Sequence, residues 1–215
     1  MADRRKIVIL GTSLGAEHLA DLIGECPELE LTAFAENWDR DRCARPLLGY
    51  PVLWIDDLPP LATTHQAVCA LATTERWRFV QPVEAMGFEF AVVRHPTAHV
   101  SPSARLGPGT TVSVGAIVGA HTILGRHVIV HRGCLIAHHT TVGDYVTFGP
   151  GANVAGAVTI GDRTWIGMGS IVIDYRSVGT GSVVGAGAVV TKDVPDHVQV
   201  VGVPARITKS VETAR

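Results

Sequence analysis

The sequence predicts a small α/β unit with a parallel sheet, followed by a parallel β-helix built from six-residue repeats. Two observations carry this prediction. In the first part of the chain, strand-like and helix-like segments alternate. From residue 100 to residue 190, an apolar residue recurs at every sixth position without interruption. We place the boundary near residues 95–97, which divides the chain into domains of residues 1–97 and 98–215.

The N-terminal part contains apolar runs that suit strands, separated by segments that suit helices. Strands are predicted at 6–11, 29–34, 66–72 and 89–93. Residues 14–23 have helical spacing, and a second helix is expected near 74–86. Because alternating strands and helices are typical of βαβ units, these segments predict a parallel sheet.

The C-terminal part has a strict period of six, with inner apolar residues that run from Val100 through Ile136 to Val190. Four positions after each apolar residue the side chain is usually small, as at Ala116 and Thr140. A large aliphatic then fills the interior, a small residue fits the crowded corner, and glycine or a polar residue makes the bend. Three strands complete one coil, so residues 18 apart should stack at about 4.8 Å.

Composition excludes several classes of protein. The net charge is −2 and there is no basic block, so nothing indicates binding to nucleic acid or to an anionic membrane surface. The apolar run at residues 6–10 is too short for a signal sequence or a membrane span, and we expect a cytoplasmic protein without membrane insertion. The four cysteines are scattered without a C-x-x-C pair, which indicates reduced thiols.

The repeat resembles the hexapeptide-repeat acyltransferases, whose fold is a left-handed parallel β-helix. Residues 184–195 and 201–206 are similar to the closing segment of that family. Over essentially the whole chain, including residues 49–53 and 95–104, the sequence is similar to sugar acetyltransferases of the NeuD and PglD type. In these, a short Rossmann-like domain that binds a nucleotide sugar precedes the β-helix. The resemblance implies acetyl-CoA as co-substrate and no metal.

That resemblance also implies an activity. We expect N-acetylation of a nucleotide-linked 4-amino-sugar in cell-surface glycan synthesis. Acetylation of a hydroxyl group of sialic acid or a related sugar is the alternative. The sequence leaves open which sugar and which nucleotide are used, and whether nitrogen or oxygen is acetylated.

Candidate catalytic residues come from a motif match to the family. An amine that attacks a thioester must lose a proton, and histidine suits this role because its pKa lies near ~6.5. By similarity, His138 takes the place of the family's general base. The family has an acidic residue directly after the base and an Asn seven residues before it, where this chain has His139 and His131. Gly156 matches the position whose backbone N–H meets the thioester carbonyl in the family.

The resemblance assigns the donor side as well. In relatives the pantetheine arm of acetyl-CoA lies in a groove between subunits, near the positions of Met168 and Ala186. The last coil and the tail bind the adenosine end, which makes Lys192 and Arg206 candidates for its phosphates. Relatives form homotrimers by pairing flat faces of the β-helix. We expect the same here, with Tyr145, Trp165 and Tyr175 among the residues on those faces.

Candidate acceptor-binding residues lie in the N-terminal domain, at Gly11, Ser13, Leu14, Gly15, Glu36 and Asn37. The glycine-containing turn loosely resembles a dinucleotide fingerprint, and a plain strand–helix connection is the alternative. The family's Gly-Gly-His is replaced by residues 13–15, and its Asp-Asp by Glu36-Asn37. A nucleotide can bind here through backbone N–H groups at the start of the helix.

Two other classes of function remain open. In a metal-dependent hydratase on the same fold, resembling the γ-type carbonic anhydrases, His121 and His139 would be two zinc ligands because they are 18 residues apart. The His-x4-His pattern expected of that class is absent. In a non-catalytic binding protein, the N-terminal domain would sense a nucleotide sugar without acetyl transfer. The altered neighbours of His138 keep that reading open.

Overall fold

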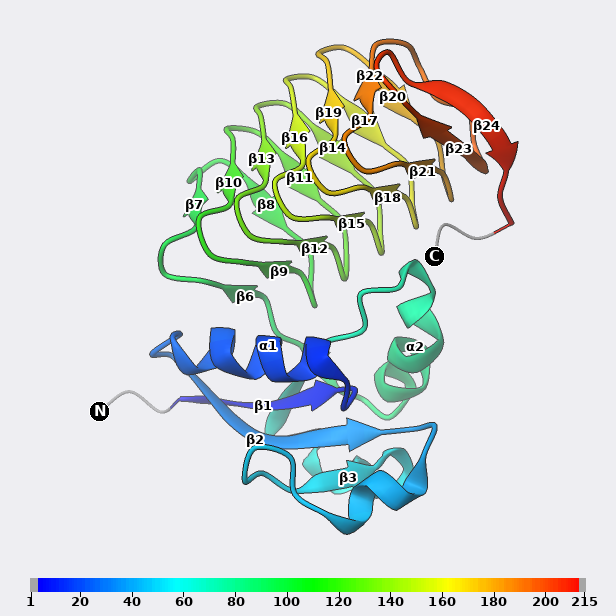
Figure 1. The fold of residues 1–215 in the computed structure, drawn as a ribbon. Coiled ribbons are helices and arrows are strands. Elements are labelled where there is room, and N and C mark those ends of the chain that lie inside the picture. The colour runs from blue at the N-terminus through cyan, green and yellow to red at the C-terminus, as the bar shows by residue number, and fades with distance from the viewer. Residues whose placement is uncertain (1–3, 213–215) are drawn as a thin grey trace. The chain divides into compact units, whose positions relative to one another are not determined.

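The computed structural model describes residues 4–212, which form two compact units (Figure 1). Unit 1 contains the residues up to 72 together with 76–96, and unit 2 contains 73–75 together with the residues from 97 onward. Within residues 4–212, no helix has both the length and the apolar character needed to cross a membrane.

Unit 1 is built on a five-stranded parallel sheet with the strand order β3-β2-β1-β4-β5. Its strands are β1 (Arg5–Leu10), β2 (Leu29–Glu36), β3 (Val52–Trp54), β4 (His65–Cys69) and β5 (Glu89–Phe90). The short β6 (Val93–Arg94) follows and is not part of this sheet. Its α-helices are α1 (Leu14–Gly24) and α2 (Trp77–Ala85). Short 3₁₀ turns lie at η1 (Arg40–Ala44), η2 (Ile55–Asp57), η3 (Pro59–Leu61) and η4 (Thr74–Arg76).

The predicted parallel sheet is confirmed, with differences at its edges. The sequence reading missed β3, because three residues are too few to show a period of two. The strand predicted at 66–72 ends at Cys69, since its neighbour β1 ends at Leu10 and the two pair residue for residue. The helix predicted near 74–86 begins as the 3₁₀ turn η4, and α2 starts at Trp77.

Unit 2 is a parallel β-helix with three strands in each coil. The first face contains β7 (His99–Val100), β10 (Ile117–Val118), β13 (Leu135–Ile136), β16 (Asn153–Val154), β19 (Ile171–Val172) and β22 (Val189–Val190). The second face contains β8 (Arg105–Leu106), β11 (Ile123–Leu124), β14 (Thr141–Val142), β17 (Thr159–Ile160) and β20 (Ser177–Val178). The third face contains β9 (Thr111–Val112), β12 (Ile129–Val130), β15 (Thr147–Phe148), β18 (Trp165–Ile166) and β21 (Val183–Val184).

The predicted stacking of residues 18 apart is confirmed for the pairs formed among β7 to β22, whereas β21 pairs with β23 (Val198–Val201) in a register of 16, with Val184 opposite Val200. Val118 pairs with Ile136, and Ile136 pairs with Val154. The inner apolar positions form one continuous core, in which Ile136 and Phe148 are fully buried. Small residues fill the corners, where the hydroxyl of Thr140 donates to the backbone carbonyl of Ala155. The six-residue period of the sequence therefore reflects the packing of the interior, because each strand contributes one inward-facing apolar residue.

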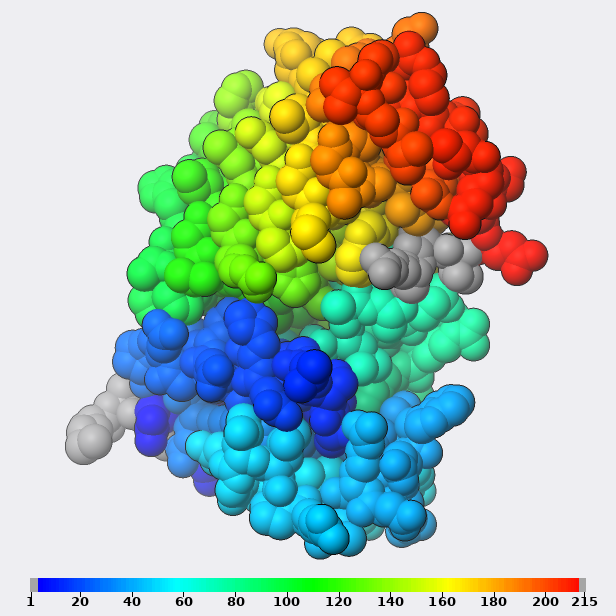
Figure 2. Space-filling view, in the orientation of Figure 1, coloured from blue at the N-terminus to red at the C-terminus, as the bar shows by residue number. Residues whose placement is uncertain are grey.

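The β-helix ends in a pair of strands that breaks the parallel pattern. β23 (Val198–Val201) continues the third face beside β21. The chain then turns and β24 (Arg206–Ser210) runs antiparallel to β23. Figure 2 shows this closing segment in red, beside the last coils in orange.

Candidate active site

The corner between the first and second faces of the β-helix carries two adjacent histidines. One residue at this corner in successive coils has a left-handed backbone, with φ of 58° at His121, 57° at His139 and 55° at Ala157 and Tyr175. Histidine adopts this conformation more readily than most residues with a Cβ. The pairing of residues 18 apart places the ring of His121 beside that of His139, with ring centroids 4.9 Å apart.

His138 and His139 are in direct polar contact. Their Nδ1 atoms lie 3.1 Å apart, a hydrogen-bond distance, and their rings meet edge to face. Both side chains are exposed. The imidazole of His138 is therefore accessible on the outside of the β-helix, and it is in contact with a neighbour at the same corner.

Gly156 lies against the ring of His138, one coil further along. A Cβ built on Gly156 would fall 2.6 Å from Cε1 and 2.9 Å from Nε2 of His138. The carbonyl oxygens of His138 and Gly156 accept hydrogen bonds from Ala157 and Tyr175. Within residues 4–212, the backbone N–H of Gly156 has no acceptor. The backbone of Gly156 and the imidazole of His138 therefore lie close together on the outside of this corner.

The remaining predicted residues of the β-helix lie elsewhere in the chain. His131, Met168 and Ala186 share the corner between the third and first faces, where Met168 and Ala186 are exposed one coil apart. His131 thus lies at a different corner of the β-helix from His138 and His139. Lys192 and Arg206 are exposed beyond the last full coil. A single chain therefore does not bring the predicted base and the predicted donor-binding residues together.

A buried thiol lies at that second corner. Burial is the main cause that raises the pKa of Cys134 to about 11. A thiol with such a pKa is a poor nucleophile at neutral pH. All four cysteines are free, as the sequence predicts.

Unit 1 has a pocket of about 490 Å³ at the carboxyl ends of its central strands. It is lined by Thr12, Ser13, Leu14, Glu17, Arg42, Arg45, Pro46, Leu47 and Val52. Ser13 and Leu14 were predicted at this position, and Ser13 precedes α1 without a side-chain cap. Arg42 and Arg45 were missed, because they lie in a segment without a motif between β2 and β3.

Glu36, at the end of β2, organises the wall of this pocket. Its Oε1 accepts the backbone N–H groups of Asn37 at 2.9 Å and of Trp38 at 2.8 Å. Its Oε2 accepts a hydrogen bond from the hydroxyl of Thr12. The oxygen of that hydroxyl in turn accepts a hydrogen bond from Nη1 of Arg42, at 2.9 Å. Burial raises the pKa of Glu36, but these hydrogen bonds outweigh it and lower the pKa below its usual value.

Two glycines of the predicted turn are required by its backbone. Gly11 has φ of 113°, a conformation that residues with a Cβ rarely adopt. A Cβ on Gly15 would lie 2.8 Å from the backbone oxygen of Ala70. Glycine at residue 15 therefore lets the start of α1 approach the end of β4 closely.

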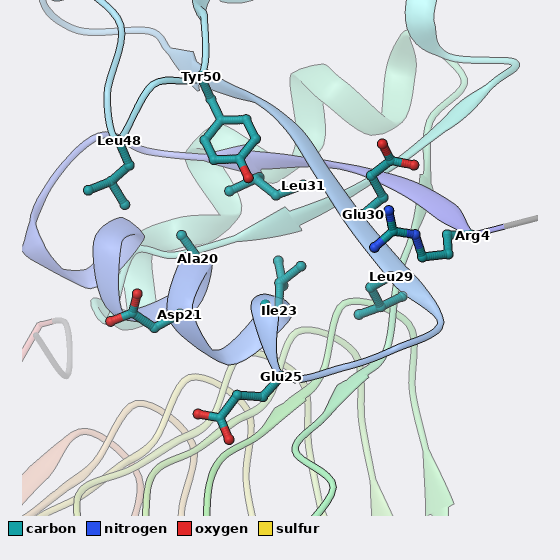
Figure 3. A pocket seen from close by; sticks show the side chains of 11 residues that line it. Arg4, Ala20, Asp21, Ile23, Glu25, Leu29, Glu30, Leu31, Leu48 and Tyr50 are labelled. Carbon is teal, nitrogen blue, oxygen red and sulfur yellow. The ribbon is translucent and has the colours of Figure 1, made fainter.

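Another pocket of unit 1, of about 720 Å³, lies elsewhere on the sheet. Figure 3 shows Asp21 and Ile23 of α1 opposite Leu31 of β2, with Tyr50 above them. None of the eleven described residues that line it belongs to the predicted sites.

The stacked histidines also bear on the hydratase alternative. His121 and His139 lie side by side, as their spacing of 18 predicts. Among residues 4–212, no group of three or more His, Cys, Asp or Glu side chains is arranged to hold a metal ion.

Comparison with known proteins gives a consistent result. Residues 121–156 match the bacterial transferase hexapeptide (six repeats) family. A variant of GDP-perosamine N-acetyltransferase from Caulobacter crescentus, in complex with CoA and GDP-perosamine, has 30% identity and a TM-score of 0.87; the match covers 95% of this chain and 97% of that one. The acetyltransferase domain of PglB from Neisseria gonorrhoeae FA1090, in complex with acetyl coenzyme A, has 30% identity and a TM-score of 0.88, over 96% and 100% of the chains.

A third solved structure agrees with these two. WeeI from Acinetobacter baumannii AYE has 29% identity and a TM-score of 0.86, over 95% of this chain and 100% of that one. A search of curated proteins gives no match.

The fold and these matches define a hexapeptide-repeat transferase with a Rossmann-like N-terminal sheet and a left-handed parallel β-helix. More particularly, the chain belongs to the CoA-dependent sugar acetyltransferases of the NeuD and PglD type. It is therefore an acyltransferase that uses acetyl-CoA as co-substrate and acts on a sugar.

Proposed function

We propose that the protein transfers the acetyl group of acetyl-CoA to the amine of a nucleotide-linked 4-amino-sugar, in the cytoplasm, for cell-surface glycan synthesis. The relatives named above support N-acetylation, since one of them is a GDP-perosamine N-acetyltransferase with CoA and GDP-perosamine bound. The observation that carries the proposal is the exposed ring of His138 beside Gly156, whose backbone N–H has no acceptor in the part of the chain that the structure describes.

In this proposal, His138 is the general base. The amine nitrogen attacks the thioester carbon and its proton passes to Nε2 of His138. The carbonyl oxygen gains negative charge, which the N–H of Gly156 stabilises. When the tetrahedral intermediate collapses, the C–S bond breaks and CoA leaves as a thiolate. The absence of a side chain at Gly156 supports this role, because a ligand can approach the backbone there.

The acceptor's nucleotide would bind in the pocket of unit 1 that Ser13 and Leu14 line. The start of α1 offers backbone N–H groups that have no partner within the helix. Arg45 adds positive charge at the pocket, whereas Arg42 is already paired with Glu36 at 3.8 Å and with Asp39 at 3.6 Å. Gly11 and Gly15 would shape the turn. Glu36 would act indirectly through Thr12, which lines the pocket, since both oxygens of Glu36 already accept hydrogen bonds, one of them from the backbone N–H of Asn37.

We also propose that the active unit is a homotrimer. His138 and His139 lie on one edge of the first face, whereas His131, Met168 and Ala186 lie on the other edge. A second copy placed along this face would bring its residues from one edge toward those of the other. The outward side chains of the face support such pairing, because Ile117 and Ile171 are 42% and 41% exposed. Lys192 and Arg206 would then contact the phosphates of CoA. Light scattering of the purified protein measures the number of chains directly.

The first experiment is a thiol-release assay with acetyl-CoA against a panel of nucleotide-linked 4-amino-sugars, with free sialic acid as comparator. Release with one amino-sugar supports the proposal and identifies the acceptor. Release with sialic acid alone favours O-acetylation. If acetyl-CoA binds but no acceptor gives release, the non-catalytic alternative gains support.

The role of His138 is tested with His138→Ala. We expect kcat to fall by about 10²-fold or more, because a positioned base contributes about 10²–10⁴-fold. His18→Ala, which removes an exposed imidazole of α1, is the control. Wild-type turnover in His138→Ala would exclude His138 as the base without affecting the fold.

A further inference from the structure

The residue after the base differs in kind from the acidic residue expected there. A carboxylate can only accept a hydrogen bond from the base, whereas a neutral imidazole has one donor and one acceptor nitrogen. The structure places Nδ1 of His139 3.1 Å from Nδ1 of His138. If both rings are neutral, one of these two atoms must therefore carry the hydrogen and the other must supply the lone pair.

We infer that His139 is a positioning residue, whose Nδ1 lone pair accepts the Nδ1–H of His138 and so leaves Nε2 of His138 as the proton acceptor. The inference rests on the proposed role of His138 as the base. In the reverse arrangement, Nε2 of His138 would carry a hydrogen and could not take the proton of the amine. The tautomer of a catalytic histidine is commonly set in this way, by the partner of its second nitrogen.

The corner of the β-helix holds His139 in the required place. Its left-handed backbone, with φ of 57°, and the backbone hydrogen bond from its N–H to the carbonyl of Ala120 fix where the side chain starts. The ring of His121 packs beside it, 4.9 Å away. Among residues 4–212, His121 and His138 are the titratable side chains in ring contact with His139. His121 lies one coil before His139 in the same column, and His138 precedes His139 at the same corner.

The step balances with these groups alone. The N–C bond to the acetyl carbon forms, the C–S bond breaks, and the thiolate of CoA leaves with the electron pair. The amine proton moves to Nε2 of His138. The hydrogen on Nδ1 of His138 then lies between two nitrogen lone pairs, so the positive charge is shared with His139. A carboxylate would neutralise this charge instead, and that is the chemical difference between the two kinds of partner.

Three variants of His139 distinguish its role as a hydrogen-bond acceptor for His138 from other roles of the side chain. Asn places its side-chain oxygen near the position of the imidazole Nδ1 and tolerates a left-handed backbone. His139→Asn therefore keeps a neutral acceptor, His139→Asp supplies a charged one, and His139→Ala removes the acceptor. We expect kcat to fall about 10- to 100-fold in His139→Ala and to stay within about threefold in His139→Asn. The KM for acetyl-CoA should change by less than about twofold in each.

The direct readout is the tautomer of His138, followed by ¹⁵N NMR of histidine-labelled full-length protein at pH 8, where free imidazole is neutral. We expect hydrogen on Nδ1 of His138 in the wild type and in His139→Asn, and a mixture of tautomers in His139→Ala. His197→Ala is the control, because His197 has the same left-handed backbone at another corner and is exposed. It should leave the tautomer and kcat unchanged.

Two results would overturn the inference. One is an unchanged tautomer of His138 in His139→Ala. The other is a His139→Asn variant as slow as His139→Ala. Either would leave the base assignment intact, since that depends on His138→Ala. Conversely, an active His138→Ala variant would remove the proposed base even if the NMR signals behave as expected.

Discussion

Adding one methyl group at Gly156 should disable the enzyme without unfolding it. In Gly156→Ala the new Cβ would fall 2.6 Å from Cε1, 2.9 Å from Nε2 and 3.1 Å from Nδ1 of His138. Carbon atoms in contact are normally about 3.5–4.0 Å apart, so the imidazole must move by roughly 1 Å. A displacement of this size can lower the rate about 10²-fold, which corresponds to about 2.7 kcal/mol of activation free energy.

The effect on stability should be small for two reasons. The ring that must move is exposed and can rotate into solvent. The backbone of Gly156 also lies outside the left-handed region, so alanine adds no conformational strain. We expect the free energy of unfolding in urea to change by less than about 1 kcal/mol.

The assay is kcat for thiol release with saturating acetyl-CoA and acceptor, measured beside Gly24→Ala. Gly24 ends α1, and a Cβ there would have no neighbour within 4 Å, so this control should keep wild-type turnover. If folded Gly156→Ala turned over at the wild-type rate, the contact between residue 156 and His138, the proposed base, would be irrelevant to catalysis. The proposed geometry of the site would then be wrong.

Two further predictions concern stability. The pKa of Glu36 is lowered in the folded protein, so its stabilisation is present above the unfolded-state pKa of about 4.3 and is lost as the pH falls through the folded value. The difference in free energy of unfolding between wild type and Glu36→Gln should therefore be largest at pH 7 and decline below about pH 4. A constant difference across urea titrations at several pH values would contradict this. Phe148 is fully buried in the β-helix, so Phe148→Ala should lower the free energy of unfolding in urea by about 3–5 kcal/mol. Thr159 is exposed on β17, so the control Thr159→Ala should lower it by less than about 0.5 kcal/mol. Equal losses in the two variants would contradict the assigned interior.

The architecture of the β-helix could be predicted because a single packing rule repeats. Every inner position needs an aliphatic or aromatic side chain, and Ile136, Phe148 and Val184 obey that rule without tertiary information. The sheet of unit 1 was predictable to a lesser degree. β3 has three residues, and its pairing with β2 depends on a partner that is distant in sequence rather than on a local pattern.

The candidate site was predictable only where the spacing of two residues along the sequence determines that they are in contact. The spacing of 18 between His138 and Gly156 places them in one column, so their proximity follows from the sequence. The contact between the Nδ1 atoms of His138 and His139 does not, because it depends on side-chain rotation at a left-handed corner. Arg42 was beyond reach for another reason: its place in the pocket follows from a hydrogen-bonded chain through Thr12 to Glu36, which no spacing indicates.

The antiparallel strand β24 has a consequence for how the molecule behaves among its own copies. Every coil of a parallel β-helix presents unpaired backbone groups to the next, and an uncovered last coil would be a template for another chain to add to. β24 occupies the edge of β23 and carries Arg206 and Lys209, whose positive charges disfavour further pairing. The closing strand therefore acts as a terminator: it sets the length of the solenoid and protects a surface that could otherwise seed fibrous aggregation.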